Sequence, residues 1–196
     1  MGHSTRFAPI LASRHGEDGM SSSTIRLSET DLRAVAEYAA LSAHPALAIF
    51  ERDRPDDLRA RAAIQAARSF ASGGSRSKSQ RDSAWAAQRA AIEARDEGLR
   101  AAYEAARAAL AAAGAGFLHP LANPSQVKHI LGAAGHAARA FEISAGDVPA
   151  VGADYLARSR LLASREVVDV LRRYPGPPPG GGRVGELIRQ LDSLLR

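Results

Sequence analysis

The chain of 196 residues contains no cysteine, and only 5% of its residues are aromatic. The lack of cysteine excludes disulfides, thiolate metal sites and cysteine nucleophiles, and it fits a reducing compartment. No apolar run approaches the roughly 20 residues that a membrane-spanning helix needs, and the N-terminal segment has no secretory hydrophobic region. The sequence therefore predicts a soluble, cytoplasmic protein without a membrane segment.

Lysine is also scarce, since 24 of the 26 basic residues are arginine and only Lys78 and Lys128 are lysine. Acidic residues alternate with the arginines, and the net charge is a mild +5. A surface that binds polyanions needs basic residues gathered on one face, and the densest basic run, residues 76–81, is short. Nucleic-acid binding is therefore not favoured.

Hydrophobic residues make up 45% of the chain, and many of them are alanine. Alanine is the strongest helix former, and its small side chain lets helices approach closely. We therefore predict an all-α, single-domain bundle of about seven or eight helices, with stacked helical hairpins as an alternative arrangement.

Composition and periodicity divide the chain into four parts. Residues 1–23 lack periodicity and are predicted to form a disordered extension, whereas residues 24–174 form the helical domain. Prolines and glycines fill residues 175–183, which we expect to be a linker. Residues 184–196 form an amphipathic helix that is expected to dock on the body through an apolar face: Leu187, Ile188, Leu191 and Leu194.

Polar and proline residues mark the helix ends. Ser28, with Asp31 three residues later, is an N-cap pattern, and Pro45 should kink or split the first helix near His44. A second helix is predicted behind Asp53, with Pro55 in its first turn. Its apolar positions are Leu58, Ala62, Ala66 and Phe70.

The later helices have similar boundaries. One begins at Ser77, is interrupted near residues 96–98 and ends at Gly114 and Gly116; the next follows Asn123 and Pro124, and two shorter ones cover residues 149–163 and 164–173. Glycine in a helix interior is unfavourable unless another helix crosses closely. The two glycines inside the helix after residue 124 therefore predict a close crossing: Gly132 and Gly135.

Three histidines are candidate binding residues. His129 and His136 share one helical face, but about 10 Å of helix rise separates them, so they are poorly spaced for one metal ion. His119 lies in the preceding loop and could fold back toward His129. No metal site is predicted.

Two neighbouring helices carry further candidates. Arg61, Gln65 and Arg68 form a polar stripe, which is either a solvated face or the edge of a groove for a carboxylate from another helix or a partner. Trp85 and Gln88 have matching spacing on the next helix. A single tryptophan is more typical of a core.

No catalytic motif is present: there is no nucleophile elbow, no phosphate-binding glycine loop after a strand and no distinctive carboxylate pair. The sequence thus favours a binding protein over an enzyme and predicts no catalytic residue and no cofactor. An alternative is a small helical enzyme or ligand-binding protein. Its pocket would be lined by Arg61, Gln65, Arg68, Trp85, Gln88, His119, His129 and His136.

Three segments, DDLRARAAIQAARSF (56–70), AWAAQRAAIEARD (84–96) and VKHILGAAGHAARAFE (127–142), resemble the bacterial family of putative immunity proteins over residues 27–143. The family pattern is alanine-rich and all-helical, with a histidine where this chain has Gln88 and a shorter loop than residues 119–126. The resemblance implies a protein that binds a toxin made by the same cell or its kin and neutralises it by covering its active surface. The oligomeric state stays open.

Overall fold

The computed structural model describes residues 24–196. The predicted N-terminal extension, residues 1–23, lies outside the described part. From Thr24 onward the chain is built of helices joined by turns and loops, which confirms the predicted all-α fold. None of these helices combines the length and apolar character needed to cross a membrane.

Nine α-helices and two short 3-10 helices, η1 and η2, form the described part of the chain. In chain order they are α1 (Glu29–Ala43), η1 (His44–Ala46), α2 (Leu47–Asp53), α3 (Arg59–Ala71), α4 (Lys78–Asp96), α5 (Arg100–Ala115), η2 (Pro124–Gln126), α6 (Val127–Ser144), α7 (Pro149–Leu162), α8 (Arg165–Arg172) and α9 (Gly182–Leu195).

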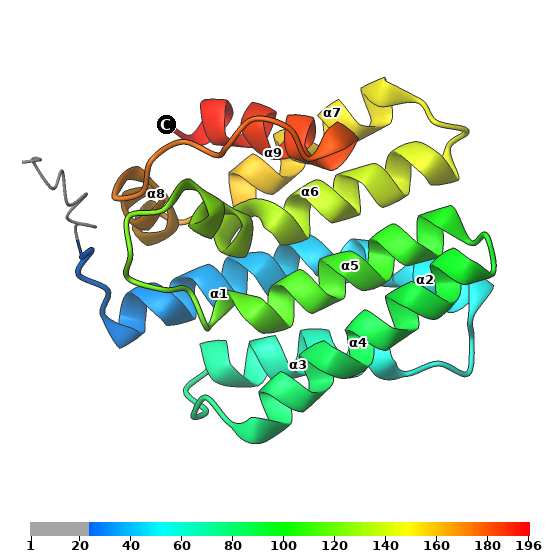
Figure 1. Cartoon of the computed structure of the whole chain (residues 1–196), viewed down its shortest axis with the longest axis horizontal. Helices are drawn as coiled ribbons and strands as arrows, with labels where there is room; N and C mark the ends of the chain where they lie inside the picture. Colours follow the sequence, from blue (N-terminus) through cyan, green and yellow to red (C-terminus); the bar gives the residue numbers. More distant parts are fainter. Residues whose placement is uncertain (1–23) are drawn as a thin grey trace, which may run out of the picture.

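Helices α5 and α6 run side by side through the middle of the molecule (Figure 1). Helices α3 and α4 lie on one side of this pair, and α7 and α9 lie on the other. Helix α5 contacts α1, α2, α3, α4 and α6, so it is one of the two central helices of the bundle, with α6 as the other.

Alanine makes this central position possible for α5. Nine of its alanines are buried: Ala101, Ala102, Ala105, Ala106, Ala108, Ala109, Ala112, Ala113 and Ala115. Such small side chains allow several neighbouring helices to approach the same backbone closely while dispersion contacts remain dense. The core therefore depends on the proximity of helices more than on large side chains.

The predicted boundaries of the first helix are confirmed. The Ser28 hydroxyl accepts a hydrogen bond from the Asp31 amide at 3.0 Å, and the Asp31 carboxylate accepts one from the Ser28 amide at 2.9 Å. At the other end, Pro45 lies in η1, which separates α1 from α2. Proline cannot donate the hydrogen bond that would continue the α-helix.

The predicted start of α3 is wrong. The helix begins at Arg59, because Pro55 sits in a turn closed by the Asp57 amide, which donates to the Arg54 carbonyl at 3.2 Å. Proline favours such a turn position. Leu58 is consequently 62% exposed, and the buried face of the helix differs from the predicted one. It consists of Ala60, Ala63, Ile64, Ala67 and Phe70.

The predicted close crossing at the glycines of α6 occurs at Gly135. A Cβ atom there would lie 2.7 Å from Cγ1 of Ile188 in α9, whereas one at Gly132 would make an ordinary 3.6 Å contact with Ala111. Helix α9 buries Leu187, Ile188, Leu191 and Leu195. Leu194, which was expected in this interface, is 44% exposed instead.

Candidate functional site

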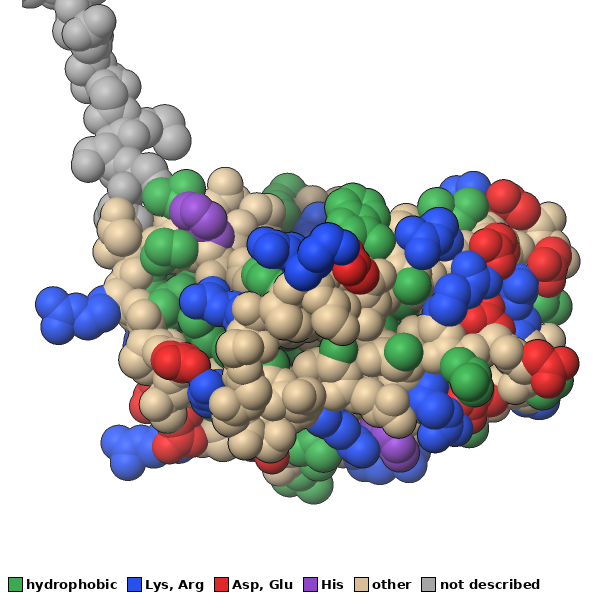
Figure 2. Space-filling model, turned by 90° about the horizontal axis from the view of Figure 1, so that it is seen from below, with side chains coloured by type: hydrophobic (Ala, Val, Ile, Leu, Met, Phe, Trp, Pro, Cys, Tyr) green, Lys and Arg blue, Asp and Glu red, His purple; other side chains and the backbone are tan. Residues whose placement is uncertain are grey.

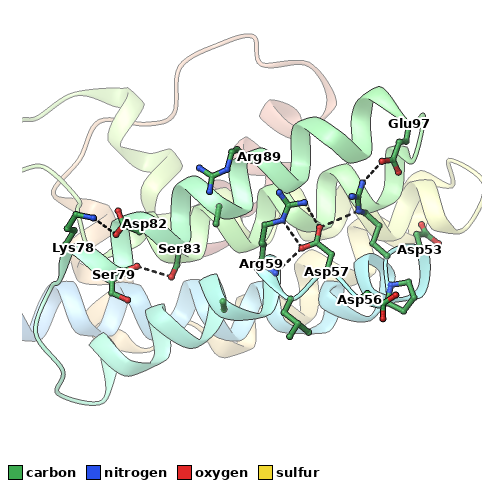
Figure 3. A pocket seen from close by; sticks show the side chains of 15 residues that line it. Asp53, Asp56, Asp57, Arg59, Lys78, Ser79, Asp82, Ser83, Arg89 and Glu97 are labelled. Atoms are coloured by element: carbon green, nitrogen blue, oxygen red, sulfur yellow. Dashed lines mark hydrogen bonds and ion pairs between the residues drawn. The ribbon is translucent and has the colours of Figure 1, made fainter.

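An open groove of about 1240 Å³ separates the N-terminal end of α3 and the preceding loop from α4 (Figure 3). We call it the α3–α4 groove. Charged side chains of both signs dominate its walls, and Figure 2 shows them gathering at the end of the molecule where α4 meets α5. Its labelled charged residues are Asp53, Asp56, Asp57, Arg59, Lys78, Asp82, Arg89 and Glu97.

One end of this groove is held together by ion pairs between two arginines and three carboxylates, which leave a net charge of −1. Arg59 binds the carboxylates of Asp57, at 2.7 Å, and of Glu93. Arg54 reaches Glu93 at 3.2 Å and Glu97 at 2.8 Å. The hydrogen bond from Arg59 lowers the pKa of Asp57 and that of Glu93, so both acids are ionised at neutral pH. This end therefore joins α3 and α4 and leaves little unpaired charge.

The α4 edge of the groove offers contact groups without partners in the described part of the chain. Arg89 makes no ion pair or hydrogen bond with any other side chain between residues 24 and 196. Trp85 lies on α4 between two residues that line the groove, Asp82 and Arg89, at spacings of three and four residues. Its side chain is 66% exposed, so the expectation of a core tryptophan is wrong.

The predicted polar stripe on α3 is exposed. Arg61 pairs with Glu51 of α2 at 2.6 Å, so it does hold a carboxylate from a neighbouring helix. Gln65 borders a shallow depression beside the start of α4. Arg68 is exposed and has no ion-pair partner among the described side chains.

A second, more enclosed groove of about 450 Å³ lies between α5, α6 and the start of α9. We call it the histidine groove because His129 and His136 both line it. His136 Nδ1 lies 2.6 Å from the Glu104 carboxylate. Arg107 donates to the Gln88 side-chain carbonyl at 3.2 Å. His136 and Gln88 thus contact side chains of α5, and His129 lines the same groove.

His129 is half-buried in this groove. Its burial lowers the pKa of the imidazole, although a hydrogen bond with the Gly114 backbone opposes this shift. The ring is therefore neutral at pH 7. Between residues 24 and 196, no three His, Cys, Asp or Glu side chains are placed to hold a metal ion together.

A family model described as Imm-5 like putative immunity protein matches residues 26–163, which is more than half of the chain. The chain belongs to this family. No curated protein matches the chain significantly, and no solved structure does.

The Imm-5 like match confirms the resemblance noted for residues 27–143 and extends it through the whole of α7. Helices α8 and α9 lie beyond the matched region. The α3–α4 groove is made entirely of family residues, whereas α9 adds one wall of the histidine groove from outside the match.

The eight predicted site residues do not converge in one pocket. His129 and His136 share the histidine groove, whereas Arg61, Gln65, Arg68 and Trp85 belong to the exposed surfaces of α3 and α4. His119 lies in the loop before η2, and its backbone carbonyl accepts a hydrogen bond from the Tyr174 hydroxyl at 2.8 Å. It does not line the groove that contains His129.

The α5 side chains that line the histidine groove were not predicted from the sequence. Tyr103, Glu104 and Arg107 are polar residues in the interior of a helix whose other positions are nearly all alanine or leucine. Such residues in a central helix of an alanine-rich bundle need partners or a cavity. Their position inside an alanine-rich helix could have indicated this groove from the sequence.

Proposed function

We propose that this protein is an immunity protein that acts in the cytoplasm, where it binds a cognate toxin and neutralises it by covering the toxin's active surface. Membership of the Imm-5 like family supports a protein partner. The identity of that partner as a toxin, and occlusion as the mechanism, are the parts of the proposal that require experiment.

We place the toxin-binding surface at the α3–α4 groove and its rim. The observation that carries this choice is Trp85, which stands 66% exposed beside the unpaired Arg89 at the edge of the groove. Tryptophan and arginine are the residue types that most often dominate binding energy in protein interfaces. Exposed tryptophan otherwise leaves a large apolar surface in water.

The charges around the groove suit a specific rather than a general partner. The ion pairs at the Arg59 end use both of its arginines, so the positive charge without a carboxylate partner among the described residues lies at Arg89 and at Arg68 on the exposed face of α3. A toxin surface with one or two acidic groups and a pocket for an indole ring would complement this arrangement. Such a surface requires no catalytic residue on the immunity protein.

Two measurements test the proposal. The first is the growth of cells that express this protein together with the toxin encoded beside its gene, and the second is the affinity between the two purified proteins. Trp85→Ala should weaken the complex about 30-fold or more, which corresponds to the roughly 2 kcal/mol of a central interface residue, and should abolish protection. Leu161→Ala is the matched control, because Leu161 on α7 is 82% exposed and lies far along the chain from α4. Loss of protection in the Leu161 variant alone would place the interface elsewhere, and the absence of any toxin complex would reject the function.

A further inference from the structure

The histidine groove contains an arginine without an acidic partner. Arg107 gives one guanidinium N–H to the neutral amide of Gln88, and its Nε atom is shielded from solvent without a hydrogen-bond partner among the described residues. The carboxylate one turn away, Glu104, is bound by His136 instead. Other partly buried arginines, such as Arg59 and Arg139, each bind a carboxylate. Arg107 therefore lacks the counter-charge that its environment favours.

Small residues leave space next to this arginine. Gly114 and Ala111 on α5, Gly132 on α6 and Gly185 on α9 line the groove and contribute little or no side chain. A Cβ atom at Gly132 would touch only Ala111, at 3.6 Å. The volume of about 450 Å³ falls within the range of about 300–1,000 Å³ that is usual for small-molecule sites.

The walls of the groove combine aliphatic surface with a few charged groups. Leu110, Val184 and Ile188 supply aliphatic surface from α5 and α9. Lys128 adds a second positive charge, whereas the negative charge of Glu104 is engaged by His136. A ligand that matches these features has one negative group and an aliphatic body.

We propose that the histidine groove binds a small carboxylic acid with an aliphatic chain, whose carboxylate pairs with Arg107 and whose chain lies along Leu110, Val184 and Ile188. Arginine binds carboxylates in a two-pronged geometry, and the Arg107 guanidinium keeps terminal N–H donors besides the one that it gives to Gln88. This site goes beyond the proposed function, since it shares no lining residue with the α3–α4 groove.

The first experiment titrates the full chain with saturated carboxylates from butyrate to decanoate by calorimetry, and follows the ring signals of His129 and His136 by NMR. We expect binding of one acid per chain, with shifts in both histidine signals. Octan-1-ol, which has the chain without the charge, should bind at least tenfold more weakly than octanoate. Equal binding of the alcohol, or no binding by any acid of the series, would overturn the proposal.

Variants then locate the carboxylate. Arg107→Gln should weaken octanoate at least tenfold, because a charge-assisted hydrogen-bond pair is lost. Arg68→Gln makes the same chemical change at an exposed arginine of α3 and should leave the affinity unchanged. Gly132→Leu should block the groove. If this variant fails to fold, Gly132→Ala replaces it in the binding test, because an alanine side chain fits there without a clash. Octanoate binding that is insensitive to Arg107→Gln would contradict the assignment.

The carboxylate that pairs with Arg107 could also belong to an acidic side chain of a partner protein. If no acid of the series binds, but Arg107→Gln weakens the toxin complex, the carboxylate belongs to the partner and the small-molecule site is wrong. Because the titrations contain no toxin, their outcome does not depend on whether the proposed immunity function holds.

Discussion

Two clusters of arginine and carboxylate side chains join helices in this protein, and they differ in their contact with water. In the first cluster, Glu142 of α6 is completely buried and accepts hydrogen bonds from Arg139 at 2.9 Å and Arg183 of α9 at 2.6 Å. In the second, Arg59 binds Asp57 and Glu93, and the Glu93 side chain is 45% exposed.

The comparison shows how burial changes the contribution of an arginine–carboxylate pair to stability. An exposed carboxylate that loses its arginine is hydrated again, so an exposed pair contributes little. A buried carboxylate has no water to replace a lost partner, and removing one member of a buried pair is costly. We therefore expect the Glu142 cluster to be essential for the docking of α9 and the Asp57–Arg59–Glu93 cluster to adjust local structure at the α3–α4 groove.

The largest effect is expected for Glu142→Ala. The substitution removes the buried carboxylate that joins Arg139 to Arg183, leaves these arginines only their exposed partners Asp147 and Glu186, and opens a cavity. The free energy of unfolding should therefore fall by about 3–5 kcal/mol. Urea denaturation measures this change. Glu186→Ala is the control, because Glu186 also pairs with Arg183 but is 54% exposed, and its loss should cost less than about 1 kcal/mol. Equal losses for the two variants would remove the distinction between the clusters.

A smaller loss is expected for Gly152→Ala in α7. The new Cβ atom would clash with the side chain of Glu142, so the buried carboxylate must shift. Overpacking of this kind usually costs about 1–3 kcal/mol, although alanine favours the helix by up to about 1 kcal/mol. Thermal unfolding should show a lower midpoint. Gly132→Ala, whose Cβ meets no such obstacle, should raise the midpoint; a similar rise for Gly152→Ala would contradict the described packing.

At the second cluster, where Arg59 is 29% and Asp57 11% exposed, Arg59→Ala should lower the free energy of unfolding by about 1 kcal/mol. The loss is smaller than at Glu142 because Arg54 still pairs with Asp57. The difference from the parent protein should shrink further in high salt, because ions screen exposed charges. Urea denaturation at low and high salt measures both effects. A loss as large as that of Glu142→Ala, unaffected by salt, would show that this cluster is also effectively buried.

The smallest effect is a pH dependence at Asp57. The hydrogen bond from Arg59 lowers the pKa of Asp57 below the value of 3.8 for a free aspartate, so the folded state favours the ionised form. The resulting stabilisation is complete above pH 3.8 and is lost as the pH falls through the lowered pKa. Unfolding curves for the parent and for Asp57→Asn should differ most above about pH 4 and converge in stronger acid. Divergence in acid would mean that the sign of the pKa shift is wrong.

Much of the fold was predictable because its determinants are local. The Ser28 cap, the break at Pro45 and the stop after Ala115 each depend on residues within a few positions of one another. The start of α3 was missed because Pro55 fits a first helical turn as well as a β-turn. The side chain of Asp57 decides between them, since it accepts the Arg59 amide at 3.1 Å and ends the loop there.

The candidate sites were less predictable. The shared face of His129 and His136 followed from helical periodicity, and both residues do line one groove. Their partners on α5 could not be derived, because the contact between His136 and Glu104 joins residues 32 positions apart. Trp85 was expected in the core because large aromatic side chains gain most from burial, but alanine fills the buried face of α4.

By itself, the sequence determined that this chain forms helices and where most of them begin and end, because alanine content, caps and prolines act within one or two turns. The tertiary structure decided which faces are buried, that Trp85 remains in water, and that Glu142 pairs with Arg183, 41 residues away. These outcomes depend on which helices become neighbours, and the free energy of that packing is shared among residues that are distant in the chain.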